Sequence, residues 1–349
     1  MRISSRMLRG GFFLSAALAA GVAHGDASQA RVDRISPPAQ NFFSKRAIVE
    51  KIPIEAHADV PDAAVRAGAE RLSRMLAHAP RIAANLRARS LEVEIAGKSQ
   101  LISDLPPFHE LRGTIFHGRD FDDDTRGAGH LWLKYVSCAE GNLLGYTNDL
   151  RYQHDICVHE IAHAVMWLGM SPQARARIYT VFGKFKSRWA GVYAATDMAE
   201  YFAELSMWYF GSSSGQAPVY DAKPGPQWLA KYDPDGYAAL DAVYTDRDDP
   251  GSCPIVTLAP QPAQSEGQTR SIEGKLPVTL TLHNGTTRTL VTYWLDYAGT
   301  RQSREMFAPG TDKTFYSWAT HAWVVAEPDE KAHAVYVLPA TDTEATVQP

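Results

Sequence analysis

The chain has 349 residues, of which 45% are hydrophobic and 21% are charged, and its formal net charge is −4 at pH 7. This length predicts two domains. The slightly acidic balance argues against nucleic acid or an anionic membrane as a partner, because both require a basic surface. Beyond the N-terminal leader, no stretch approaches the ~18 consecutive apolar residues of a membrane span.

Residues 1–25 have the parts of a secretory signal peptide. Three arginines precede a short apolar stretch, residues 11–22, and small residues follow it where signal peptidase cleaves. Removing this segment would change the net charge from −4 to −7, because it contains three arginines and no acid. The protein is therefore predicted to be secreted or periplasmic.

Residues 26–50 are polar and predict an irregular leader. An amphipathic pattern then predicts one long helix over residues 62–89. Alternating apolar residues predict a strand at 91–95 and another at 130–136. The apolar side of the predicted helix consists of Leu72, Met75, Leu76, Ile82 and Leu86.

An HExxH motif lies in an apolar, helix-forming run over residues 156–168. Positions i and i+4 of a helix share one face, so His159 and His163 can direct two imidazoles at one zinc ion. Glu160 would lie beside the metal, where a general base is needed. Cys157 does not share the position of these histidines on the helix, and a buried or disulfide-bonded role is predicted for it.

A second helix is predicted to start after Thr196 or Asp197 and to run to Phe210. It carries Glu200 and Glu204 one turn apart among apolar residues. Buried carboxylates require a partner or a metal, so Glu200 is the expected third ligand, and Glu204 is expected to orient a ligating histidine. The alternative is a solvated acidic face.

Together the two motifs, HEIAH and YAATDMAEYFAE, resemble the gluzincin metallopeptidases related to the catalytic domain of anthrax lethal factor. The resemblance implies that His159, His163 and Glu200 bind zinc and that Glu160 is the general base. It also implies that Tyr193, seven residues before the third ligand, lies over the metal-bound carbonyl. Residues 140–144 resemble the E-x-N-L-L element of bacterial secreted relatives. An α+β zincin-like metallopeptidase domain is therefore expected over residues 51–257, with a protein or peptide substrate.

Residues 258–275 are rich in proline, glutamine and glycine and predict a linker. From residue 276 to 349 the pattern changes to period two, with a hairpin turn predicted at Asn284–Gly285. This segment is predicted to be a small all-β sandwich. The chain contains three cysteines, which is consistent with one disulfide and one leftover thiol in an oxidising compartment.

The C-terminal segment also resembles the β domain of the von Hippel–Lindau tumour suppressor, through YWLDY, APGT and YSWATHAW. In that family a Ser and a His bind the hydroxyl of 4-hydroxyproline, and two Trp help to wall its ring. The matching residues are Ser317, His321, Trp323 and Trp294. A family Tyr is replaced here by Arg304. The alternative is that both Trp are core residues and His321 lies on the surface.

The sequence thus predicts an exported zinc endopeptidase with a C-terminal recognition domain, for which hydroxyproline-containing proteins are the expected ligands. Two alternatives remain open. One is a catalytically inactive zincin-fold binding protein, which the intact set of motif residues argues against. The other is a non-proteolytic zinc hydrolase.

Overall fold

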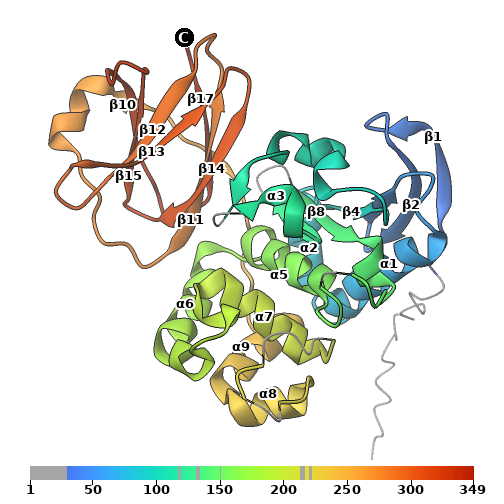
Figure 1. The fold of residues 1–349 in the computed structure, drawn as a ribbon. Coiled ribbons are helices and arrows are strands. Elements are labelled where there is room, and N and C mark those ends of the chain that lie inside the picture. The colour runs from blue at the N-terminus through green and yellow to red at the C-terminus, as the bar shows by residue number, and fades with distance from the viewer. Residues whose placement is uncertain (1–29, 117–118, 131–133, 150, 213–216, 220–221) are drawn as a thin grey trace, which may run out of the picture.

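The computed structural model describes residues 30–349 except 117–118, 131–133, 150, 213–216 and 220–221. The predicted signal peptide, residues 1–25, lies outside the described residues. Figure 1 shows a mixed α/β region followed by a separate C-terminal β region. Among the described residues, no helix has the length and apolar character needed to cross a membrane.

The N-terminal domain contains a six-stranded sheet with the strand order β1-β2-β3-β4-β8-β7. The central pairs, β3 with β4 and β4 with β8, are parallel, and the other pairs are antiparallel. Among the described strands of this sheet, β7 forms one edge. The strands are β1 (Asp33–Ala39), β2 (Phe43–Val49), β3 (Ile52–Ala56), β4 (Glu92–Ala96), β7 (Gly127–His130) and β8 (Tyr135–Ala139).

The predicted irregular leader over residues 26–50 is wrong for its described part, because β1 and β2 lie within it. Phe43, Lys45, Ala47 and Val49 are all buried along one side of β2. The Nζ atom of Lys45 lies 3.1 Å from a carboxylate oxygen of Asp62. A buried lysine whose partner is distant in sequence interrupts the apolar alternation by which a strand is recognised.

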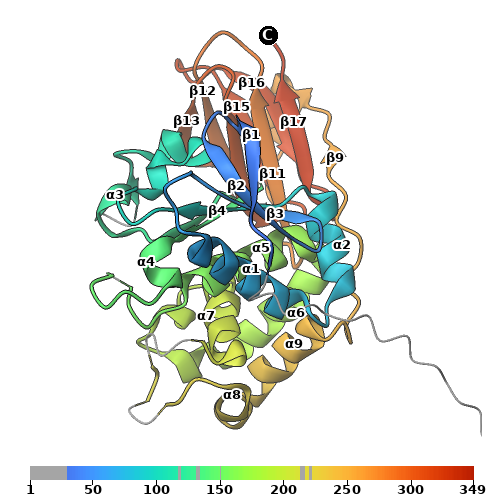
Figure 2. The ribbon, with the colours of Figure 1, turned by 90° about the vertical axis from the view of Figure 1, so that its right-hand side faces the viewer.

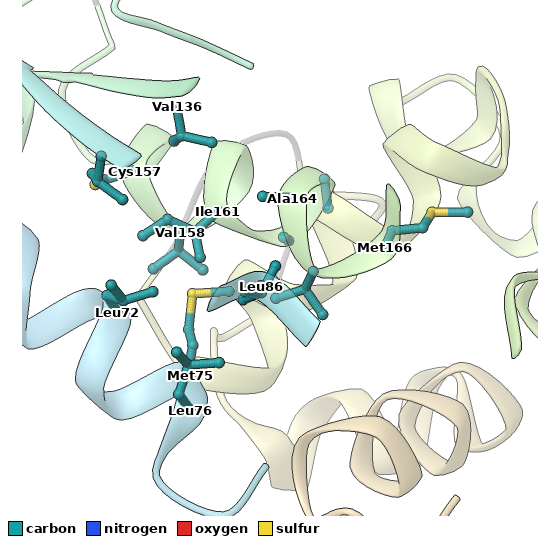
Figure 3. Packing of buried hydrophobic residues seen from close by; sticks show 14 of the residues in the cluster. Leu72, Met75, Leu76, Leu86, Val136, Cys157, Val158, Ile161, Ala164 and Met166 are labelled. Atoms are coloured by element: carbon teal, nitrogen blue, oxygen red, sulfur yellow. The ribbon is translucent and has the colours of Figure 1, made fainter. Parts of the chain in front are cut away.

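The helix predicted over residues 62–89 is two helices, α1 (Asp62–Leu76) and α2 (Pro80–Ala88). Pro80 begins α2, where its missing N–H costs no hydrogen bond, and a proline at that point does not continue α1. The predicted apolar residues are all buried. Figure 3 shows Leu72 and Met75 close to Val158 of helix α5 (Ile156–Gly169). Leu76 and Leu86 belong to the same buried cluster.

The strand predicted over residues 130–136 is also two elements. His130 belongs to β7 and Tyr135 to β8, and the two residues pair across an antiparallel ladder. Lys134 has a φ of 70°, a left-handed conformation that suits a turn. The apparent alternation in the sequence therefore spans a chain reversal.

Helix α5 (Ile156–Gly169) contacts the sheet through β7 and β8 and also contacts α1, α2 and α7. Figure 2 shows α1 and the helices α5 to α9 below the sheet, with the C-terminal domain above. One apolar core joins the sheet to these helices. The remaining α-helices of the described domain are α3 (Phe121–Asp124), α4 (Glu140–Leu143), α6 (Pro172–Phe185), α7 (Met198–Phe210), α8 (Pro226–Tyr232) and α9 (Pro234–Tyr244).

The C-terminal domain consists of a five-stranded sheet, β10-β16-β15-β12-β13, and a four-stranded sheet, β14-β11-β17-β9. Buried residues of both sheets form one shared core, as in a small β-sandwich. The strands are β9 (Val256–Thr257), β10 (Gln261–Pro262), β11 (Pro277–Asn284), β12 (Leu290–Leu295), β13 (Arg301–Phe307), β14 (Asp312–Trp318), β15 (Ala322–Ala326), β16 (Ala332–Val337) and β17 (Thr343–Val347).

Two predictions for this region need correction. The segment 258–275 is not a free linker, because β10 pairs with β16 and the 3-10 helix Ala263–Gln268 contacts β16. Asn284–Gly285 does not close a hairpin, because β11 and β12 belong to different sheets. The side-chain amide of Asn284 instead donates to the carbonyls of Arg288 and Phe307 and holds the connection between the sheets. Short polar turns look alike in sequence whether or not their strands pair.

Candidate active site

The start of α5 is held by two side chains. Asp155 accepts a hydrogen bond from the backbone N–H of Val158 at 3.3 Å and caps the helix. Asn142, in the segment that resembles E-x-N-L-L, accepts from the N–H of Ile156 at 3.1 Å. Its amide donates to the carbonyls of Arg151 and His154 at 3.0 and 2.7 Å. These bonds fix where the HExxH helix begins.

The same end of α5 is joined to the sheet. A disulfide links Cys138 of β8 to Cys157 of α5, so Cys157 is not available as a metal ligand, and Cys253 is the buried free thiol. Strand β7 approaches closely. A Cβ atom on Gly127 would lie 2.5 Å from Ile156 Cγ2 and 3.0 Å from Glu160 Cγ. Only glycine permits this approach, a requirement that the sequence did not reveal.

Helix α7 supplies the two acidic residues. Asp197 is the N-cap and accepts from the N–H groups of Ala199 and Glu200 at 2.8 and 3.0 Å. Gly211 ends the helix in the left-handed conformation. Glu204 is 1% exposed, which contradicts the alternative of a solvated acidic face.

Three of the predicted site residues converge on one point. The Nε2 atoms of His159 and His163 are 3.1 Å apart, and Oε2 of Glu200 lies 3.1 and 3.5 Å from them. Ligand atoms at 2.0–2.1 Å from a shared tetrahedral zinc ion would lie about 3.3 Å apart. The three residues therefore form a cluster that could hold a metal ion, and its donor set fits zinc.

A further histidine, which the sequence reasoning missed, lies beside this cluster. Oε1 of Glu204 is 3.3 Å from Nδ1 of His159 and 3.3 Å from Nε2 of His154. Glu204 thus contacts the ring nitrogen of His159 that faces away from Glu200. His154 precedes α5 and belongs to no motif, so its only signal was its chemical type.

The electrostatics of the site favour a cation. Burial opposes ionisation of Glu204, but His154 and His159 outweigh it and lower its pKa to about 2. In the same way, contacts with both motif histidines outweigh burial and hold the pKa of Glu200 well below its usual value. Burial lowers the pKa of His159, but these two carboxylates outweigh burial and raise it. The buried Glu204 and the half-buried Glu200 require positive charge beside them, which protons or a divalent ion can supply.

Glu160 and Tyr193 lie beside the cluster with their pKa values shifted upwards. Burial is the main cause for Glu160. Burial, followed by the charge of Glu200, raises the pKa of Tyr193, so its hydroxyl keeps its proton and remains a hydrogen-bond donor. Its ring stacks on His159, with centroids 6.3 Å apart. Tyr193 belongs to the 3-10 helix Tyr193–Ala195, just ahead of α7.

These residues open into a cleft of about 600 Å³. Gly127, Ala128 and Gly129 of the edge strand β7 line one part of it. The cleft therefore places a sheet edge beside the cluster of His159, His163 and Glu200.

The four residues predicted for a C-terminal ligand site also lie together. Ser317 Oγ is 3.2 Å from Nδ1 of His321, and Nε1 of Trp323 donates to Ser317 Oγ at 3.2 Å. The ring of Trp294 lies 5.4 Å from that of His321. His321 is 7% exposed, so the alternative of a surface histidine is wrong, and burial lowers its pKa. Trp323 does belong to the sandwich core, which agrees with the alternative interpretation of this residue.

Comparison with known proteins gives one family match. Residues 269–336 match the VHL beta domain family. The C-terminal part of the chain thus resembles that domain, as predicted, and the match begins within the segment predicted as a linker. One similar solved structure is the Pro-Pro endopeptidase PPEP-2 from Paenibacillus alvei. The two are 18% identical, with a TM-score of 0.42, over 54% of this chain and 96% of that one. The chain has no significant match among curated proteins.

Proposed function

We propose that this protein is a zinc-dependent endopeptidase. The observation that carries the proposal is the convergence of His159, His163 and Glu200, whose ligand atoms lie within 4.8 Å of one another, beside the half-buried Glu160 in an open cleft. Two His and one Glu leave a fourth coordination position free, which is the arrangement of catalytic rather than structural zinc sites.

When bound, zinc would lower the pKa of a water ligand to about 7 and polarise the scissile carbonyl. Glu160 would accept a proton from the attacking water and return it to the leaving amine. Burial supports this role, because a raised pKa brings a carboxyl closer to neutral pH. The protonated hydroxyl of Tyr193 would donate a hydrogen bond to the developing oxyanion.

An extended peptide is the substrate that best fits the cleft. The edge strand β7 lines it and has no strand partner on its outer side among the described residues. Such an edge can add a substrate segment as a further strand, with main-chain hydrogen bonds that do not depend on side-chain identity.

The experiment compares the parent with Glu160→Gln, both loaded with zinc. The variant should keep about one zinc per chain and lose peptide hydrolysis, because it removes the base and no ligand. Turnover within tenfold of the parent would contradict the role of Glu160. Zinc binding by a parent that cleaves no peptide would favour an inactive binding protein, and activity on another class of bond would favour a different zinc hydrolase.

We further propose, as a second function, that the C-terminal domain binds hydroxyproline-containing proteins. The observation in favour is the grouping of Ser317 and His321 beside the rings of Trp323 and Trp294. A hydroxyl flanked by an imidazole and indole walls offers directional polar groups on an apolar surface. Full-length Glu160→Gln, which would not cut the ligand, should bind a hydroxyproline peptide more tightly than its proline twin. Equal affinity for both peptides, or binding to neither, would contradict the proposed binding of hydroxyproline.

We also propose that the protein is exported. This proposal rests on the predicted signal peptide and is supported by the Cys138–Cys157 disulfide, because disulfides persist in oxidising compartments. Fractionation of cells that produce the full chain should place the processed protein outside the cytoplasm.

A further inference from the structure

One strand of the sandwich turns aromatic side chains towards the N-terminal domain. Along β14, Phe315 and Ser317 are buried on the sandwich side, at 5% and 6% exposure. Neighbouring side chains of a strand point to opposite faces, so Tyr316 and Trp318 face away from the sandwich core. Tyr316 remains 45% exposed.

These two side chains meet aromatic residues of the N-terminal domain. The ring centroid of Tyr316 lies 4.4 Å from that of Trp167, and the centroid of Trp318 lies 4.5 Å from that of Tyr179. Trp167 is on α5, one turn beyond the motif residue His163, and Tyr179 is on α6. The contacts therefore begin next to the metal-binding cluster.

The aromatic residues also line the cleft that contains the cluster. Tyr316 and Trp318, with Pro277 of β11, border the same cavity as His159, Glu160 and Glu200. Figure 1 shows β14 and β11 on the side of the sandwich nearest α5 and α6. One wall of the cleft thus comes from a different domain than the candidate catalytic residues.

The position of this wall is set by buried contacts. The guanidinium of Arg175 on α6 pairs with Asp342 of the sandwich at 2.7 Å, and both residues are at most 1% exposed. The same guanidinium lies over the ring of Trp167 at 4.9 Å. A wall held by such contacts is preorganised, so a ligand does not have to order it on binding.

We infer that Tyr316 and Trp318 form, with Trp167 and Tyr179, a subsite that binds a bulky apolar side chain of the peptide substrate. The C-terminal domain is then a part of the substrate-binding cleft and sets its specificity. Tyr316 and Tyr179, which are 45% and 41% exposed, gain free energy when apolar surface covers their rings, and small or charged side chains cannot supply that surface. The inference rests on the proposed peptidase function.

The test profiles cleavage of a peptide library by full-length, zinc-loaded protein. The parent should prefer a bulky apolar residue at one substrate position. The double variant Tyr316→Thr/Trp318→Thr should lose that preference, with kcat/KM for the preferred peptide about ten- to a hundredfold lower, mainly through KM. Threonine has a high propensity for strands, so β14 should remain folded.

Two further variants serve as controls for the cleavage profiles. Ile272→Thr removes a 63% exposed apolar side chain of the same domain that does not line the cleft, and it should leave the profile unchanged. Tyr316→Phe/Trp318→Phe keeps an apolar wall and should keep the preference, even if the threonine variant unfolds. A parent that cleaves peptides while both double variants match its profile would overturn this inference alone. A zinc-loaded parent that cleaves no peptide would overturn it together with the proposed function.

Discussion

Arg175 and Asp342 form an ion pair that is completely enclosed between the two domains. The Nη2–Oδ1 distance is 2.7 Å, and the two residues are 0% and 1% exposed. Oδ1 of Asp342 also accepts from the backbone N–H of Thr279 at 2.9 Å. One carboxylate therefore holds α6 of the N-terminal domain against β11 of the sandwich.

Asp342→Ala should destabilise the protein by about 3–5 kcal/mol, because it leaves the Arg175 charge buried without its partner. Chemical unfolding of the variant and the parent measures this difference. Arg177→Ala is the control, since Arg177 pairs with Asp248 at a site where both side chains are 46% exposed, and a loss below about 1 kcal/mol is expected there. Equal losses of unfolding free energy in the two variants would show that the buried pair stabilises the protein no more than the exposed pair does.

Glu200→Ala and Tyr193→Phe should separate metal binding from catalysis. The first removes a carboxylate of the cluster and should lose tightly bound zinc. The second should retain zinc and lower kcat by about 10²–10³, because it removes only a hydrogen-bond donor. Metal content and turnover are measured on the same samples. Tight, stoichiometric zinc in Glu200→Ala would place the third ligand elsewhere, first of all at Glu204.

Glu204→Ala should weaken zinc binding by about 10- to 100-fold, because Glu204 contacts Nδ1 of His159 and orients its ring. Glu204→Gln should retain more of the affinity, since an amide oxygen can still accept a hydrogen bond from Nδ1 of His159. Competition with a chelator measures both. Glu70→Ala, at an exposed position on α1, provides a carboxylate control. If Glu204→Ala binds zinc as the control does, Glu204 has no orienting role.

Removing the Cys138–Cys157 disulfide should cost about 3 kcal/mol, as expected for a bridge between residues 19 apart in sequence. The double variant Cys138→Ala/Cys157→Ala is compared with the parent by thermal unfolding. Cys253→Ala, which removes the buried free thiol, controls for the loss of sulfur atoms from the interior. A double variant as stable as this control would mean that the bridge does not stabilise the fold.

Glu94 should make stability depend on pH. Burial, then the charges of Glu92 and Glu55, raise its pKa from 4.5 to about 9. The pKa of Glu94 is higher in the folded than in the unfolded protein. The protonated carboxyl therefore makes its full contribution to the free energy of unfolding below about pH 4.5, and this contribution is lost as the pH rises towards 9. Relative to the parent, Glu94→Gln should gain up to about 1.4 kcal/mol per pH unit across this window. Unfolding at several pH values measures the difference, and Glu305→Gln, at an exposed ion pair, is the control. A difference that does not change with pH would exclude a protonated Glu94.

Local regularities in the sequence were sufficient to predict which residues lie at the centre of the candidate site. His159 and His163 share a helix face because the helical repeat is fixed by the backbone, and the same rule relates Glu200 to Glu204. The N-cap of α7 was also readable, since Asp197 bonds to groups only two and three residues away. The period-two pattern likewise predicted the C-terminal β domain, although not which of its strands pair.

Contacts between distant segments were beyond such rules. The sequence by itself determined which residues could converge on a metal, because each motif lies within one or two helical turns. Only the tertiary structure decided that His154 reaches Glu204, that Cys138 pairs with Cys157, and that Tyr316 of the sandwich borders the cleft that contains His159 and Glu160. These contacts depend on how separately formed elements pack, and no periodicity along the chain encodes the packing of one element against another far from it in sequence.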